Sequence, residues 1–209
     1  MIKKVKTELA LLIFLYLSIL YSYSFDLLVY DNLLHIKSGV RNDYLKNFFI
    51  KITKFGDSLW YFLLFVILFF VSYLFKVKNW SLFSYFRNLS IFCFLHLLSI
   101  GLVTQIIKHI VGRPRPNHTN LEEDISFNYF SSESIFHSFP SGHSSTIICV
   151  CLIACSIIPS LKYFFYFFAA IISLSRVIVG AHFFTDIVAG ALLALIIFRV
   201  LDHYFKKNN

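Results

Sequence analysis

Hydrophobic residues in this chain gather in long runs, and short polar connections separate one run from the next. A helix needs about 20 apolar residues to cross a bilayer, because each residue adds only about 1.5 Å of length. The runs therefore predict six membrane-spanning helices, which we place at residues 9–30, 59–75, 89–107, 144–158, 163–179 and 183–201.

Between the first two runs the pattern changes from continuous to periodic. Five cations are spread over residues 35–57, and apolar residues recur among them at helical spacing, at Leu45, Phe48, Phe49, Ile52 and Phe55. This spacing places the apolar residues on one face of a helix. We expect an amphipathic helix that lies in the membrane interface.

The composition excludes several classes of protein. Of 209 residues, 58% are hydrophobic and only 14% are charged, whereas about a quarter of the residues of a soluble domain are charged. So few charged side chains are not enough to cover the surface of a soluble globule, which excludes a soluble enzyme. The same hydrophobic composition excludes a disordered chain, a collagen and a coiled coil. We predict an all-α integral membrane protein in which residues 1–209 form one domain.

The distribution of charge bears on partners and orientation. The net charge of +8 does not indicate nucleic-acid binding, because the cations lie mostly in short connections. Lys3, Lys4 and Lys6 precede the first run, as in a signal peptide, but the run is long for one and we expect it to remain as a span. Six spans place both termini on one side, which carries ten Lys and Arg against nine on the other. Without Lys108, Arg115 and Arg176, which we assign to a functional site, the count is ten against six, a modest bias that favours the cytoplasm for the termini.

Ionisable residues near the bilayer are costly and usually functional, and here they form three groups at one end of the predicted bundle. The first group, residues 108–116, follows the third span, and the second, residues 140–143, precedes the fourth. The third, residues 175–186, joins the last two spans. One end of the bundle thus carries cations, two histidines, a carboxylate and a glycine turn, a combination that suits a phosphate dianion.

The cations and the glycine turn offer contacts for phosphoryl oxygens. Lys108 and Arg115 bracket a loop that two prolines stiffen, and Arg176 adds a guanidinium that binds two oxygens at once. Ser141 and Gly142 precede the fourth span, where the free N–H groups of a helix start attract an anion. Gly142 also lets the anion approach the backbone closely.

His182 and Asp186 are four residues apart and therefore share one face of a helix. A carboxylate that accepts one ring N–H fixes the tautomer of the imidazole and leaves its other nitrogen free to attack. His143 comes from a different helix start, from which it protonates the leaving oxygen. The two histidines then need opposite protonation states.

Together the three groups resemble the motifs of the type 2 phosphatidic acid phosphatase (PAP2) superfamily, KxxxxxxRP, PSGH and SRxxxxxHxxxD, and match all of them without a departure. The resemblance implies a metal-independent phosphatase, without a cofactor, that works through a phosphohistidine. It makes His182 the nucleophile, Asp186 its orienting partner and His143 the general acid. It assigns binding of the phosphoryl oxygens to Lys108, Arg115, Ser141, Gly142 and Arg176.

The resemblance leaves the substrate open. We expect the substrate to be a phospholipid or isoprenoid-lipid phosphate, as a monoester or a diphosphate. Related bacterial enzymes act on lipid A phosphates, undecaprenyl diphosphate, phosphatidylglycerophosphate or phosphatidate. Of these we prefer lipid A phosphates and undecaprenyl diphosphate. We expect a bacterial inner-membrane enzyme with a site that faces the periplasm. We also expect that residues 117–139 and the interfacial helix select the lipid. The alternatives are a lipid-linked phosphotransferase and a non-catalytic lipid-binding or transport protein.

The remaining polar residues have structural interpretations. Arg113 lies in the first group but outside the defining positions of the motif, and we interpret it as interfacial. The four cysteines lie inside apolar runs, where packing explains them better than a disulfide or a metal, and residues 122–124 form a short acidic loop. Structural roles are also expected for the other histidines: His35, His96, His109, His118, His137 and His203.

Overall fold

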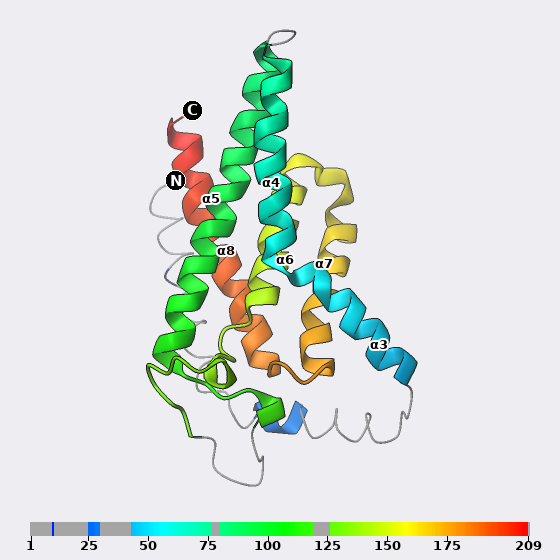
Figure 1. The fold of residues 1–209 in the computed structure, drawn as a ribbon, viewed down its shortest axis with the longest axis vertical. Helices are drawn as coiled ribbons and strands as arrows, with labels where there is room; N and C mark the ends of the chain where they lie inside the picture. The colour runs from blue at the N-terminus through cyan, green and yellow to red at the C-terminus, as the bar shows by residue number, and fades with distance from the viewer. Residues whose placement is uncertain (1–9, 11–24, 30–42, 77–79, 119–125, 209) are drawn as a thin grey trace.

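The computed structural model describes residues 10, 25–29, 43–76, 80–118 and 126–208, and all regular elements in this part of the chain are helical (Figure 1). Four of these helices are long and apolar enough to cross a membrane. They are α4 (Ser58–Ser72) with its extension η2 (Tyr73–Phe75), α5 (Trp80–Val111), α7 (Lys162–Ile178) and α8 (Phe184–Asn208). The predicted all-α integral membrane protein is confirmed. Most of the first predicted span lies outside the described residues, so the number of six is not tested.

The fifth apolar helix, α6 (Gly142–Ile157), occupies the centre of the bundle and packs against α5, α7 and α8 (Figure 1). Its 16 residues make a length of about 24 Å, less than the hydrocarbon core of about 30 Å. It begins where the Ser141 hydroxyl accepts a hydrogen bond from the Ser144 N–H. It ends before Pro159, because the residue that precedes a proline disfavours helical geometry.

α5 is longer than the sequence predicted at both ends. The prediction placed a span at residues 89–107 and a polar connection before it, but the helix begins at Trp80 and forms a long hairpin with α4 (Figure 1). The aromatic ring of Phe83 packs on that of Tyr73, with the ring centroids 5.1 Å apart, and this contact extends the helix into the connection. At the other end α5 continues to Val111, so that Lys108 lies in its last turn.

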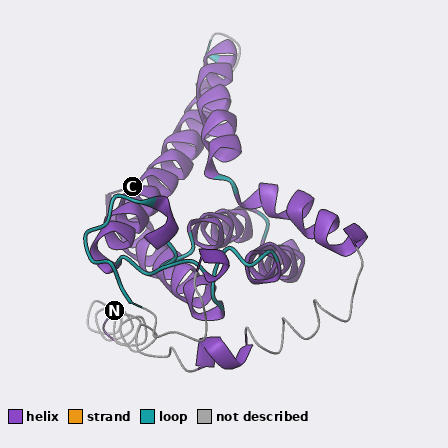
Figure 2. Ribbon diagram, turned by 60° about the horizontal axis from the view of Figure 1, so that its bottom comes forward, coloured by secondary structure: helices purple, strands orange, loops and turns teal. Residues whose placement is uncertain are grey.

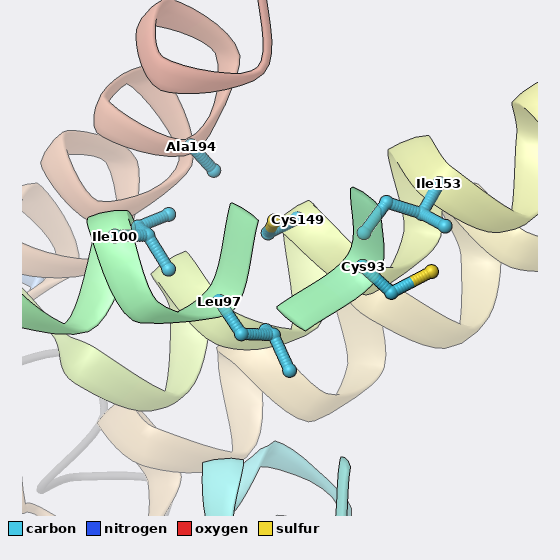
Figure 3. Packing of buried hydrophobic residues seen from close by; sticks show 6 residues of the cluster. All are labelled: Cys93, Leu97, Ile100, Cys149, Ile153 and Ala194. Carbon is cyan, nitrogen blue, oxygen red and sulfur yellow. The ribbon is translucent and has the colours of Figure 1, made fainter. Parts of the chain in front are cut away.

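Small and branched residues fill the core between α5, α6 and α8. Its centre is formed by Cys93, Leu97, Ile100, Cys149, Ile153 and Ala194 (Figure 3). The two cysteines of this cluster are free and buried, which agrees with the packing role that the sequence predicted for them.

One further helix, α3 (Asp43–Ile52), runs obliquely away from the bundle (Figures 1 and 2). It packs against α7, and the short helix η1 (Thr53–Gly56) that follows it packs against α6 and α7. Tyr44 and Phe48 on α3 are exposed. The part of the predicted amphipathic segment before residue 43 lies outside the described residues, and its position in the membrane interface stays a prediction.

α8 crosses α6 closely because Gly190 has no side chain. A Cβ atom at Gly190 would lie 2.6 Å from the carbonyl oxygen of Ser141 and 3.1 Å from the backbone nitrogen of Ser145. The Ser141 N–H also donates to the carbonyl oxygen of Asp186, at 3.0 Å. These contacts fix the start of α6 against the first turns of α8.

We expect Gly190→Ala to destabilise the protein by about 1–3 kcal/mol, because the added methyl group overpacks this crossing. Thermal unfolding in detergent measures the effect. Gly101→Ala is the matched control: Gly101 is also helical, and a Cβ atom there would meet nothing within 4 Å. Equal unfolding temperatures for the two variants would show that the crossing tolerates a side chain.

Candidate active site

The three polar groups of the sequence meet in one cavity, at the end of the bundle where α5 and α7 finish and α6 and α8 begin (lower end in Figure 1). The cavity has a volume of about 250 Å³. Six of the eight predicted site residues line it: Lys108, Arg115, Gly142, His143, Arg176 and His182. The other two, Ser141 and Asp186, are fully buried beside it.

Three cations surround the cavity, and each is held by a neighbouring oxygen. Lys108 Nζ donates to the carbonyl oxygen of His137 at 2.7 Å, and Arg115 Nε donates to the carbonyl oxygen of Ser134 at 3.0 Å. Arg176, in the last turn of α7, donates from Nη1 to a threonine hydroxyl at 3.0 Å, while its buried Nε has no hydrogen-bond partner among the described residues. These side chains create a positive potential that attracts an anion.

The start of α6 forms one wall of the cavity. Ser141 is the N-cap residue, and its hydroxyl is engaged with the N–H and the hydroxyl of Ser144. Its predicted contact with phosphoryl oxygens stays a prediction. Gly142 lines the cavity, and a Cβ atom there would come no closer than 3.9 Å to its neighbours. The glycine thus leaves open space beside the first N–H groups of the helix, where anions are favoured.

His182 lies between the cavity and Asp186. It precedes α8, is 2% exposed, and has its Nδ1 atom 3.6 Å from Asp186 Oδ2. That separation is beyond hydrogen-bond distance, so the contact is electrostatic. Burial lowers the pKa of the His182 imidazole to about 3, because a charged ring is disfavoured away from water. The ring is therefore neutral at neutral pH, the state that the predicted role of nucleophile requires.

The Asp186 carboxylate is held from several sides. It accepts hydrogen bonds from Arg113 Nη1 at 2.7 Å, Ser138 Oγ at 2.5 Å and the Phe183 N–H at 2.8 Å. Because three donors fix the carboxylate, its orientation towards His182 is set before any substrate binds.

Arg113 was predicted to be interfacial, but its side chain is buried and only 3% exposed. Besides Asp186 it binds Asp26, with Nη2 2.6 Å from Asp26 Oδ2, and its guanidinium lies over the ring of Phe183 at 4.4 Å from the centroid. The interpretation failed because the partner carboxylates are distant in sequence. A carboxylate inside an apolar run, such as Asp26, was a signal that sequence reasoning left unused.

The segment between α3 and α4 forms a wall of the cavity that the sequence did not predict. Thr53 Oγ1 accepts the hydrogen bond from Arg176, and Gly56 and Asp57 line the cavity beside His143. Asp57 adds a carboxylate to the cavity and caps α4 by accepting the Leu59 N–H. Residues expected to lie in the membrane interface and to help select the lipid thus also contact groups of the second and third motifs.

Metal-ligating side chains do not cluster in the described part of the chain, where no group of three or more His, Cys, Asp or Glu is placed to hold a metal ion. The positive charge that faces the cavity comes from Lys108, Arg115 and Arg176.

Comparisons with known proteins agree with the motifs. Residues 88–209 match the sequence model of the PAP2 superfamily, which confirms the resemblance found in the sequence. The chain is 31% identical over 167 residues to a lipid A 1-phosphatase of Rhizobium johnstonii, covering 74% of this chain and 68% of the relative. It is 32% identical over 117 residues to phosphatidylglycerophosphatase B of Bacillus subtilis, covering 51% of this chain and 53% of that protein.

The fold has a neighbour among solved structures. It is similar to a transmembrane PAP2-type phosphatidylglycerolphosphate phosphatase from Bacillus subtilis, with a TM-score of 0.70 at 23% identity, covering 96% of this chain and 97% of the other. At this level of identity the likeness concerns the fold.

We expect Gly56→Ala to lower kcat by about tenfold to a hundredfold through a small displacement of His143. A Cβ atom at Gly56 would lie 2.9 Å from both Cβ and Cδ2 of His143, so the ring has to move. Phosphate release from a lipid phosphate in detergent measures kcat. Gly101→Ala adds a methyl group to the same cavity without meeting any atom within 4 Å, and an equal loss in both variants would contradict this explanation.

Proposed function

The chain belongs to the PAP2 superfamily, and we propose that this membrane lipid phosphatase transfers the phosphate of its substrate to His182 before releasing it to water. The observation that carries the proposal is that three cations and two histidines line the same cavity. Phosphoryl transfer depends mainly on positioning and on stabilising the charge of the oxygens. The cavity supplies both.

The first step breaks the bond between phosphorus and the lipid oxygen. Lys108, Arg115 and Arg176 bind the non-bridging oxygens, with the N–H groups at the start of α6 beside them. The neutral His182 attacks phosphorus through Nε2, since Nδ1 faces Asp186. The lipid oxygen leaves with a proton from His143, and the positive charge that develops on the His182 ring is stabilised by the Asp186 carboxylate.

The second step regenerates the enzyme. Water attacks phosphorus, His143 accepts a proton from that water, and the phosphorus–nitrogen bond breaks. Inorganic phosphate leaves, and His182 is again neutral. His143 thus serves as acid in one step and as base in the other, which requires it to regain its proton in each cycle.

We propose a lipid phosphate with its headgroup at the membrane surface as the substrate, and the 1-phosphate of lipid A as the first candidate. The support for this choice is the sequence identity of 31% to a lipid A 1-phosphatase, over an alignment that covers 74% of this chain. Phosphatidylglycerophosphate follows, because the second relative is a phosphatidylglycerophosphatase. Undecaprenyl diphosphate and phosphatidate complete the set of lipids to be tested.

We also propose a bacterial inner membrane as the location, with the cavity on its outer side. The support is the bias of cations towards the termini, which favours a cytoplasmic position for that end of the bundle. In this orientation the cavity takes lipids from the periplasmic leaflet.

We expect His182→Ala to lower phosphate release at least about a thousandfold, because the nucleophile is lost, while the protein stays folded. The purified protein in detergent is assayed against the four lipids, with acid-labile labelled phosphate on the enzyme as a second readout. His203→Ala is the matched control, because His203 lies near the C-terminal end of α8, whereas the cavity lies at the start of that helix. Undiminished hydrolysis by His182→Ala would remove the nucleophile assignment, and label in a second lipid instead of free phosphate would indicate a phosphotransferase.

Activity should persist in a strong chelator, since side-chain cations bind the phosphoryl oxygens in the proposed mechanism. Vanadate should inhibit, because it adopts the five-coordinate geometry of the transferring phosphoryl group. Initial rates with and without chelator, and with increasing vanadate, test both expectations. A requirement for added Mg²⁺ in the chemical step would contradict the proposed site.

A further inference from the structure

Asp26 contacts the support of the proposed nucleophile from a distant part of the chain. It is 1% exposed and lies in a helical stretch, residues 25–29, outside the region 88–209 that matches the PAP2 model. Its Oδ2 atom is 2.6 Å from Arg113 Nη2, and its Oδ1 atom accepts the Thr185 N–H at 2.9 Å. Asp26 therefore holds both the guanidinium bound to Asp186 and the residue that precedes Asp186.

The hydrogen bonds among these groups form a closed set. The Thr185 hydroxyl donates to Asp26 Oδ2 and accepts from Arg113 Nη1 at 2.9 Å, the same nitrogen that donates to Asp186 Oδ1. All four residues are buried. A displacement of Asp26 is therefore passed on directly to the position of the Asp186 carboxylate.

The charges of the set do not cancel. One guanidinium is shared between two carboxylates, which leaves one net negative charge next to His182. If Arg113 paired with Asp186 alone, that pair would be neutral, and its effect on a positive imidazole would be weaker. Away from water such differences in charge act strongly, because little solvent screens them.

We propose that Asp26 is a positioning residue for the phosphatase reaction. It draws part of the Arg113 charge away from Asp186 and fixes both groups, so that Asp186 stabilises the positive charge that forms on His182 during phosphoryl transfer. This inference rests on the proposed role of His182 as nucleophile. The stretch before the matched region thereby contributes to catalysis through Arg113.

A merely structural role for Asp26 predicts a different pattern. Asp26 also caps the start of α8 through the Thr185 N–H, so its loss alone would lower stability. Asp26→Asn separates the two roles, because the amide oxygen still accepts that N–H while the negative charge is removed. Asp26→Glu keeps the charge and changes the length of the side chain.

The test compares steady-state and single-turnover kinetics in detergent. We expect Asp26→Asn to lower kcat and the rate of phosphohistidine formation by about tenfold to a hundredfold, as removal of a supporting contact does at other sites, with KM unchanged. Asp26→Glu should recover part of the rate. Asp202→Asn, the same substitution near the other end of α8, should leave kcat unchanged.

Arg113→Lys is the second variant, used also if Asp26→Asn does not fold. It keeps the positive charge but cannot bridge two carboxylates in a fixed fork, so kcat should fall with little change in KM. A kcat equal to that of the wild type in Asp26→Asn or in Arg113→Lys would overturn the inference. A change in KM alone, with kcat unchanged, would do the same. Wild-type enzyme and His182→Ala are measured in parallel. If the wild type is inactive or His182→Ala is active, the proposed function fails instead.

Discussion

The ion pair between Arg113 and Asp186, which Asp26 shares, is the interaction on which the site depends. All three side chains are buried, and charges removed from water are costly unless opposite charges and hydrogen bonds compensate for them. The same contacts that compensate for this burial also orient Asp186 towards His182. Stability at this end of the bundle and the proposed chemistry therefore rely on one cluster of side chains.

Around that cluster, the ends of helices carry the candidate site residues. The last turns of α5 and α7 supply Lys108 and Arg176, and the start of α6 supplies His143 and the first N–H groups of that helix. The close crossing at Gly190 keeps α6 and α8 in register. A helix bundle in this way places groups that are far apart in sequence around one cavity.

The apolar residues that face outward have a different task. Trp60, Phe70 and Phe167 are all more than 60% exposed, a pattern unfavourable in water and favourable against lipid tails. The shorter α6 lies among the longer helices, so it contributes its N-terminal end to the cavity without having to match the bilayer. The candidate site residues are concentrated at one end of the bundle, around the cavity (Figure 1), which suits a charged headgroup.

Local patterns determined much of this protein in advance. Apolar runs predicted the all-α membrane class, because a backbone in lipid must satisfy its own hydrogen bonds. Motif spacing selected Lys108, His143 and His182 as candidates, and these residues line one cavity. Only the tertiary structure decided the partners of Arg113 and Asp26 and the contact of Gly56 with His143. It also showed that α5 extends into its connection, where Phe83 packs on Tyr73. These features depend on which distant side chains come within a few ångströms, and the periodicity of one segment carries no information about that distance.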